Sequence, residues 1–306
     1  MKAMITEVKK DELTITDVVF IIAPRINAAG RMKHGNHAVT LLTESDFNLA
    51  VEYAVDIDQY NTDRRETDKR ITEEALVQIE ENSEQEGCTT VVFDENWHKG
   101  VIGIVASRLI ETYYRPTLVF TKSGDKLAAS ARSVKGFDVY NALEACKEYI
   151  EQFGGHKYAA GLTLLPENYE AFKAKFESVV KESIDPKLLT PELKIDSEIN
   201  LNEIDNRLYR ILSQFAPFGP GNMTPVFMTQ GIRDTGWGKC VGEDDKHLRF
   251  TATQNANEKL VCIGFGLGDK LDIIKNKKSF NAAYTVDENH WNGKISLQLK
   301  LKDIKA

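Results

Sequence analysis

The sequence is poor in the residues that build metal or disulfide frameworks. Its 306 residues include only 4 cysteines and 6 histidines. The cysteines are widely spaced and form no Cys-X-X-Cys pair: Cys88, Cys146, Cys240 and Cys262. This spacing argues against structural zinc and favours reduced core thiols. Asp56 and Asp58 do not converge on a helix, and the histidines are too scattered for a dense metal cluster.

The sequence also lacks an apolar run long enough to cross a membrane and an N-terminal secretory signal pattern. We therefore expect a cytoplasmic protein with no membrane partner. The net charge of −7 argues against a protein that coats nucleic acid nonspecifically. Residues 190–306 nevertheless carry 16 Lys and Arg against 15 Asp and Glu, so any nucleic-acid contact is expected in local basic grooves.

The length and an ordinary composition, 42% hydrophobic and 28% charged, predict two or three soluble domains. The first segment is residues 1–83. It opens with a strand-like run at 18–22 and a loop rich in Gly, Asn and Arg at 23–32. A long helix is expected over 45–83, with Ser45 or Thr43 as N-cap and Asp46 in the first turn. Its apolar pattern thins beyond residue 60, which favours a connector over a core helix.

The second segment, residues 84–188, alternates strands and helices and predicts an α/β domain. The pattern predicts strands at 89–93, 117–121, 126–132 and 161–165, and helices at 101–113, 138–151 and 169–182. The third segment, residues 189–306, has a helix near 202–215 and is otherwise β. Five strands at 225–234, 246–253, 259–265, 279–286 and 294–303 favour a small five-stranded barrel of the oligonucleotide-binding type.

Residues 153–161 (Phe-Gly-Gly-His-Lys-Tyr-Ala-Ala-Gly) are the most informative stretch. Gly154 and Gly155 let a tight backbone approach a ligand, and His156 stands where a polar group reaches a phosphate or reacting atom. A core histidine is the structural alternative. Upstream, Ser130, Arg132 and Ser133 form a candidate phosphate clamp, with a solvated strand edge as the alternative. On a regular strand, Ser130 and Arg132 share a face.

Two further segments carry candidate anion ligands. In the loop at 23–32, Arg25 and Arg31 flank Asn27, and arginine forks match phosphate geometry; solvated arginines in a turn are the alternative. His98 precedes a predicted helix start with glycines at 100 and 103, where free N–H groups attract anions. A histidine that caps the helix is the alternative there.

Several aromatic residues of the third segment are candidates for stacking on bases. Residues 215–222 contain two phenylalanines, although a rigid turn is at least as good an explanation. Trp237, Phe250, Tyr284 and Trp291 are the other candidates. Most aromatics of a small barrel belong to its core.

Taken in order, the motifs at 23–32, 98–108, 130–137, 153–162 and 284–301 resemble the C-terminal part of RecJ. RecJ is a family of single-stranded-DNA-specific exonucleases in the DHH phosphoesterase superfamily. The resemblance covers essentially the whole chain. It implies that 1–83 is the end of a DHH domain plus a connector helix, that 84–188 is a DHH-associated domain, and that 189–306 is an oligonucleotide-binding (OB) fold.

The resemblance also implies 5′-to-3′ hydrolysis of single-stranded DNA in repair and recombination, with two Mn²⁺ or Mg²⁺ ions that activate water. The family holds these ions in its DHH domain, partly through an Asp-His-His triplet that this sequence lacks. We therefore expect no metal ligands in this chain, no activity from it alone, and a fragment or split gene. Implied partners are single-stranded DNA, the missing DHH domain or its polypeptide, and a single-strand-binding protein or helicase.

By resemblance, Arg132 and Ser130 grip a terminal 5′ phosphate, with Arg25 or Arg31 assisting. His156 is then the catalytic residue, facing the scissile phosphate as a transition-state stabiliser. The barrel holds the incoming strand through basic contacts and base stacking. One alternative function is a non-catalytic single-stranded nucleic-acid-binding or adaptor protein. Another is a phosphoesterase for short oligonucleotides or cyclic dinucleotides, against which the barrel and the 23–32 loop argue.

Overall fold

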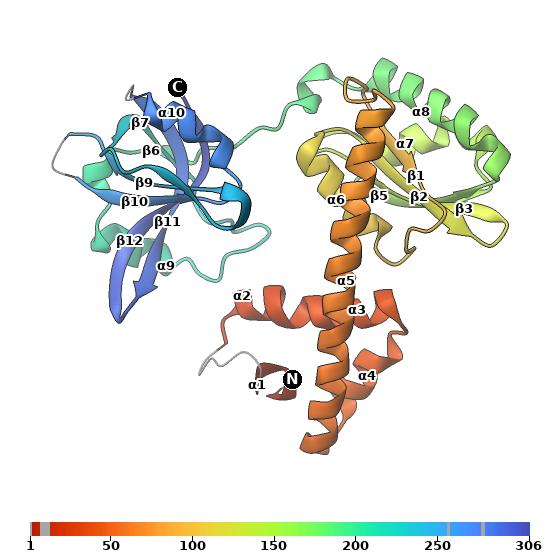
Figure 1. Cartoon of the computed structure of the whole chain (residues 1–306), viewed down its shortest axis with the longest axis horizontal. Coiled ribbons are helices and arrows are strands. Elements are labelled where there is room, and N and C mark those ends of the chain that lie inside the picture. The colour runs from red at the N-terminus through yellow and green to blue at the C-terminus, as the bar shows by residue number, and fades with distance from the viewer. Residues whose placement is uncertain (1, 7–12, 256–257, 277–278) are drawn as a thin grey trace. The chain divides into compact units, whose positions relative to one another are not determined.

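The computed structural model describes residues 2–6, 13–255, 258–276 and 279–306. The chain divides into two compact units, Met1–Pro191 and Glu192–Ala306. Figure 1 shows a helical layer, a long helix and an α/β layer in the first unit, and a mostly β second unit. Each unit has a hydrophobic core of its own.

The N-terminal part of the first unit is helical where the sequence suggested extended chain. The helices are α1 (Lys2–Thr6), α2 (Ile15–Asp17), a π-helical turn (Val18–Ile22), α3 (Ala23–Met32) and α4 (Asn36–Thr43). The predicted strand at 18–22 and the predicted loop at 23–32 are therefore wrong. A capping box between Thr14 and Asp17 starts the helical run, and Pro24 lies where the π-helical turn passes into α3.

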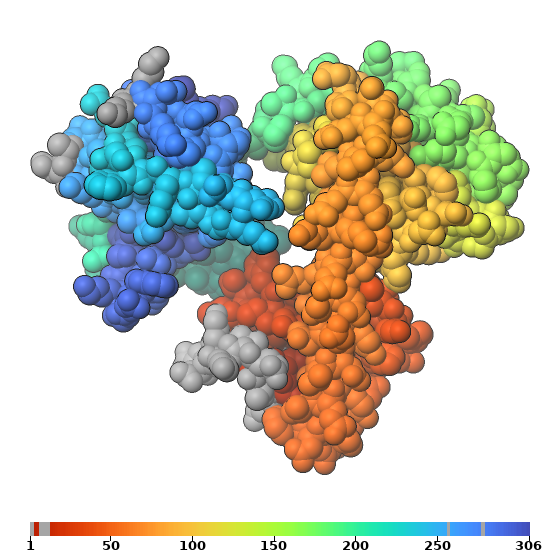
Figure 2. Space-filling model, viewed as in Figure 1, coloured from red at the N-terminus to blue at the C-terminus, as the bar shows by residue number. Residues whose placement is uncertain are grey.

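Helix α5 (Phe47–Glu81) confirms the long helix predicted from periodicity. Its N-cap is Asp46, whose carboxylate accepts from the N–H groups of residues 48 and 49, so the expected cap at Ser45 or Thr43 is wrong. The helix is more than a connector. Ile57 packs in the core of the helical layer, and Ile71 and Ile79 pack in the core shared with the α/β layer. In Figure 2 one side of α5 lies uncovered along its length, as expected of an amphipathic helix.

The α/β layer is a five-stranded sheet with helices on both faces. Its strands, in spatial order, are β1 (Thr90–Phe93), β2 (Thr117–Ser123), β3 (Lys126–Arg132), β5 (Ala159–Leu164) and β4 (Gln152–His156). The β1–β2 pair is parallel and the others are antiparallel. The predicted alternation of strands and helices is confirmed.

The two faces of this sheet carry separate cores. Helix α6 (Ile102–Thr112) packs on one face together with the second half of α5. Helix α8 (Tyr169–Ser183) packs on the other face through Phe172, Phe176 and Val180, beside the short α7 (Val139–Glu144). Two details differ from expectation. The helix predicted over 138–151 ends at Glu144, and the glycine segment around 154 is strand β4 rather than a tight loop.

The second unit is a seven-stranded sheet with α9 (Asn206–Ser213) and α10 (Leu271–Lys275). Its strands are β6 (Ser197–Glu198), β7 (Phe227–Asp234), β8 (Lys239–Val241), β9 (His247–Thr253), β10 (Leu260–Gly264), β11 (Phe280–Trp291) and β12 (Lys294–Lys305). The five predicted strands are present, but β6 and β8 were missed because two or three residues show no periodicity. The expected closed five-stranded barrel is not confirmed.

A buried carboxylate links α5 to α6. The side chain of Asp68 is 0% exposed, and Arg64 Nη1, one turn earlier on α5, donates to its Oδ2 at 3.2 Å. Arg108 Nε of α6 lies 2.7 Å from Oδ1, as an ion pair rather than an aligned hydrogen bond. Arg64 also donates to Asn61 Oδ1 at 2.8 Å. Both guanidinium groups therefore depend on one carboxylate for neutralisation.

We predict that Asp68→Ala destabilises the first unit. Removing one partner of a buried ion pair leaves uncompensated charge, so the free energy of unfolding should fall by about 3 kcal/mol. The control is Lys69→Ala, since this exposed neighbour is 4.0 Å from Glu73 and should change stability by about 0.5 kcal/mol or less. Urea unfolding followed by circular dichroism measures both, and equal small losses would contradict the role of Asp68.

Candidate functional site

Two polar side chains meet at the end of β3. Arg132 Nη1 donates to Ser130 Oγ at 3.0 Å and to the Ala131 carbonyl at 2.8 Å. Residues two apart on a strand lie on the same face, so the spacing correctly predicted this pairing. The fork of Arg132 is thereby held in place beside a hydroxyl.

The start of α6 packs directly against this pair because Gly103 has no side chain. A Cβ atom there would lie 2.8 Å from Arg132 Nη2 and 2.9 Å from Ser130 Oγ. No backbone acceptor is found among the described residues for the N–H of Gly103. The positive end of the helix dipole therefore adds to the charge of Arg132.

The end of α3 reaches the same place. Arg31 Nη1 donates to the Gly100 carbonyl at 3.1 Å, and a Cβ on Gly100 would lie 2.1 Å from the Arg31 carbonyl oxygen. His98 Nδ1 accepts from the Gly100 N–H at 3.1 Å, so His98 braces the turn before α6. Residues from α3, the β1–α6 loop and β3 are thus brought together, as the sequence motifs suggested separately.

The electrostatics of this cluster favour an anion. Burial, and then the nearby charge of Arg31, lower the pKa of the Arg132 guanidinium. Within the described ranges neither arginine has a carboxylate at salt-bridge distance. Two guanidinium groups that repel each other without a counter-charge are stabilised by a bound anion such as a phosphate.

Strand pairing connects Ser130 and Arg132 on β3 to His156 on β4 through β5. The register pairs Arg132 with Ala159 and Ala159 with His156, and pairs Ser130 with Gly161 and Gly161 with Gly154. Directly paired residues share one face of a sheet. Strands are about 4.8 Å apart, so the backbone of His156 is about 10 Å from that of Arg132. Between the two lies a floor of exposed or half-buried small residues: Gly154, Ala159 and Gly161.

His156 is held at the edge of this floor. The residue is exposed, and its Nδ1 accepts from the Tyr158 N–H at 3.2 Å. Nε2 has no partner among the described residues. Gly155 has φ +152°, and a Cβ there would lie 2.4 Å from the Ala159 carbonyl oxygen. Only glycine fits that position, which explains the second glycine of the motif.

Two predicted ligands, Arg25 and Ser133, stand apart from this arrangement, and no hydrogen bond or ion pair joins Asn27 to it among the described residues. Arg25 Nε is 2.7 Å from Asp58 Oδ1, and its Nη1 donates to the Ile21 carbonyl. The Ser133 hydroxyl donates to the Phe137 carbonyl at 3.0 Å. Asn27 is exposed and lies four residues before Arg31, on the same face of α3. Arg25 and Ser133 therefore have structural partners.

The sequence analysis did not identify Arg64 and Arg108, the two arginines that pair with Asp68. Arg64 is half-buried, and its pKa is lowered by burial and by the charges of Arg108, Arg65 and Arg31, against the raising effect of Asp68. The signal was present as an Arg64–Asp68 pair at helical i,i+4 spacing. The pairing with Arg108, which lies forty residues further along, needs the folded structure.

The aromatic residues of the second unit divide by burial. Phe250 and Tyr284 are 2% and 0% exposed and belong to the core, so they present no face to a base. Trp237 and Trp291 are 83% and 72% exposed. Asn222 Nδ2 donates to the carbonyls of residues 215 and 217, which makes the 215–222 segment a fixed turn.

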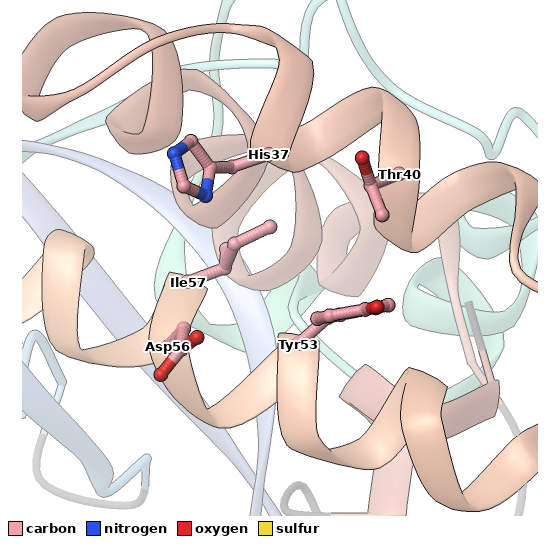
Figure 3. Close-up of a pocket in the computed structure, with 5 residues that line it drawn as sticks. All are labelled: His37, Thr40, Tyr53, Asp56 and Ile57. Carbon is pink, nitrogen blue, oxygen red and sulfur yellow. The ribbon is translucent and has the colours of Figure 1, made fainter.

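Other features of the described residues do not form a site with these groups. No cluster of three His, Cys, Asp or Glu side chains suited to a metal occurs in the ranges that the structure describes. Figure 3 shows a small pocket where His37 and Thr40 of α4 face Tyr53, Asp56 and Ile57 of α5. It contains none of the predicted ligands. No helix among the described residues is long and apolar enough to cross a membrane.

Two family models match the chain. The DHHA1 domain model matches residues 85–182, and the RecJ OB domain model matches residues 195–303. The candidate cluster at Ser130, Arg132 and His156 lies in the DHHA1 match. The end of α3 lies ahead of it.

Among curated proteins, the chain resembles single-stranded-DNA-specific exonucleases named RecJ. It is 30% identical to the Bacillus subtilis protein over 94% of this chain and 36% of that protein. It is also 30% identical to the Escherichia coli protein over 99% of this chain and 54% of that protein. The chain thus spans about half or less of the length of these relatives.

A solved RecJ structure also matches the chain. RecJ from Thermus thermophilus, in complex with Mn²⁺, superposes with a TM-score of 0.85 at 26% identity, covering 100% of this chain and 43% of that one. The same protein has been solved with Mg²⁺. The chain is therefore homologous to the C-terminal part of the RecJ single-stranded-DNA-specific exonucleases, over their DHHA1 and OB domains.

Proposed function

We propose that this chain is the substrate-binding C-terminal half of a 5′-to-3′ exonuclease that acts on single-stranded DNA in repair and recombination in the cytoplasm. The observation that carries the proposal is the uncompensated pair Arg31 and Arg132 beside the glycine floor. Homology to RecJ exonucleases supports a DNA phosphate as the anion. The second unit would hold the rest of the strand.

We assign the terminal 5′ phosphate to Arg132, Ser130 and Arg31. The guanidinium fork donates to phosphate oxygens, the hydroxyl adds a donor, and the α6 N-terminus adds a partial positive charge. Arg31 is preferred to Arg25 because Arg25 is paired with Asp58. These groups fix the end of the strand in one register on the glycine floor, where a bulkier floor would block the sugar–phosphate backbone.

His156 is assigned to the scissile phosphate. A ring nitrogen that donates to a non-bridging oxygen stabilises the negative charge that develops there during hydrolysis. Mn²⁺ or Mg²⁺, as in the solved RecJ structures, would activate the attacking water on a DHH domain. The described residues of this chain offer no cluster that fits such ions, so no metal-dependent step is assigned to them.

The domain roles follow the same proposal. Residues 1–83 are taken as the end of a DHH domain and a connector, 84–188 as the DHH-associated domain and 189–306 as the OB fold. The compact-unit boundary at Pro191 and the family matches support this division. The proposed barrel has the order β7-β11-β12-β10-β9. Its support is the pairing of β7 with β9 at Arg233–Thr253 and Asp234–Ala252, in addition to its pairing with β11.

A non-catalytic single-stranded nucleic-acid-binding or adaptor protein is the alternative. It would use the second unit and leave the cluster around Arg132 without a role. Proposed partners of the exonuclease are the DHH domain or its polypeptide, and a single-strand-binding protein or helicase.

We predict that Arg132→Ala weakens binding of a 5′-phosphorylated single strand about tenfold or more. A charge-assisted hydrogen bond contributes about 1.5–3 kcal/mol, and each 1.4 kcal/mol is tenfold. The slope of log affinity against log salt should also fall by about 0.7, the value per phosphate contact on a single strand. Fluorescence anisotropy between 50 and 200 mM salt, roughly the range where such contacts are sensitive, measures both. Unchanged affinity and slope would remove Arg132 from the site.

A matched pair on α3 separates the two candidate arginines. Arg31→Ala should weaken binding of the same strand several-fold, whereas Arg25→Ala should leave the affinity unchanged because Arg25 is bonded to Asp58 and Ile21. Both variants lose one positive charge from one helix, so the comparison cancels the effect of net charge. Equal losses would indicate nonspecific attraction instead of a built site.

We also predict that the purified chain, supplied with Mn²⁺, releases no mononucleotides from a 5′-labelled single strand. The ligands that the family uses for its metals belong to the DHH domain. Gel electrophoresis of the reaction over hours measures the release of mononucleotides. A full-length RecJ exonuclease is the positive control. Degradation that persists in the His156→Ala variant would point to a contaminating nuclease; degradation abolished by that variant would overturn the proposed division of labour.

A further inference from the structure

The turn between β4 and β5 directly follows His156 and carries an aromatic residue. His156 and Ala159 are the last paired residues of the two strands, so Lys157 and Tyr158 form a two-residue turn. Tyr158 follows His156 by two residues and is 46% exposed. An aromatic residue left this open on a compact α/β layer can offer its face to a ligand.

Three hydrogen bonds hold the backbone of this turn. The Ser133 N–H donates to the Tyr158 carbonyl at 3.1 Å, and the Val139 N–H donates to the Lys157 carbonyl at 3.0 Å. The Tyr158 N–H donates to His156 Nδ1 at 3.2 Å. Both peptide groups of Tyr158 are therefore fixed, and only two side-chain torsions remain free. Ordering such a ring on a ligand costs little conformational entropy.

The same bonds place Tyr158 between the two ends of the site. Its N–H contacts the ring of His156, and its carbonyl contacts the residue that follows Arg132. Its neighbour Ala159 is the residue that pairs with both Arg132 and His156. A nucleotide whose phosphate lies on that row has its base within reach of the turn.

The turn also carries charge. Lys157 Nζ lies 5.7 Å from the centroid of the Tyr158 ring, within the range of a cation–π contact. Lys157 has no carboxylate at salt-bridge distance among the residues described. A ring with an adjacent unneutralised cation matches a nucleotide, which presents a π-face and a phosphate together.

We propose that Tyr158 is a stacking platform for the base of the 5′-terminal nucleotide of a single strand, with Lys157 alongside it. The proposal rests on the proposed function, since it takes the terminal phosphate to lie at Arg132. Stacking on a π-face tolerates any of the four bases. Tyr158 thus lets the site hold successive terminal nucleotides of any sequence in one position.

The test uses the full chain and two 5′-phosphorylated single strands that are identical except that one has an abasic 5′-terminal nucleotide. Tyr158→Ala should weaken binding of the normal strand about fivefold or more, the effect of losing one base–aromatic stack. It should leave binding of the abasic strand unchanged. Tyr158→Trp should retain the affinity for the normal strand, because the platform is preserved.

The outcomes distinguish base stacking on Tyr158 from phosphate binding by Arg132. An equal loss on both strands, or a loss with Tyr158→Trp as large as with alanine, would show a structural role and overturn the stacking proposal. Unchanged binding in Tyr158→Ala together with a loss in Arg132→Ala would also overturn stacking while leaving the proposed function standing. If Arg132→Ala has no effect on either strand, the proposed function fails and the stacking proposal falls with it. Unfolding midpoints of all variants exclude losses due to misfolding.

Discussion

Strand β3, helix α6 and the end of α3 converge on a half-buried guanidinium that has no carboxylate at salt-bridge distance in the part of the chain that the structure describes. Arg132 lies on β3, where Ser130 and a backbone carbonyl fix its fork. Gly103 lets a helix start within contact distance of it, and Gly100 lets the end of α3 reach the same place. The N-terminus of α6 and the side chain of Arg31 add positive potential there, and a larger residue at either glycine would displace the elements that carry them.

Other arginines of the first unit are paired with a carboxylate. Asp68 pairs with both Arg64 and Arg108 between α5 and α6, while Arg31 and Arg132 have no carboxylate at salt-bridge distance among the described residues. This difference between the two sets of arginines has a physical reason. A buried ion pair stabilises a helix interface only when both partners are present, whereas an arginine that binds an external anion must not be paired with a carboxylate of the protein. The long helix α5 packs in the core of the helical layer and in the core next to the sheet that carries Arg132 and His156.

The sequence predicted elements well where periodicity is strong. Four of the five strands of the α/β layer and the 35-residue helix α5 follow from apolar spacing, and the shared face of Ser130 and Arg132 follows from strand geometry. Strand β4 was missed because its glycines show no apolar alternation. Residues 18–22 were predicted as a strand because β-branched residues favour strands. They are helical because the capping box at Thr14 starts a helix and Ile22 packs in the same core as the first half of α5. The role of Gly155 was visible only in the structure, since its φ and its contact with Ala159 decide it. The convergence of Arg31 with Arg132 likewise depends on tertiary packing, which no local pattern reports.

We infer that the cluster at Arg132 recognises a terminal phosphate and not nucleic acid in general. The most direct measurement compares the affinity of the unmodified chain for one single strand carrying either a 5′ phosphate or a 5′ hydroxyl, at constant salt. We expect the phosphorylated strand to bind about tenfold more tightly, the effect of one set of charge-assisted hydrogen bonds. Equal affinity for the two strands would contradict it.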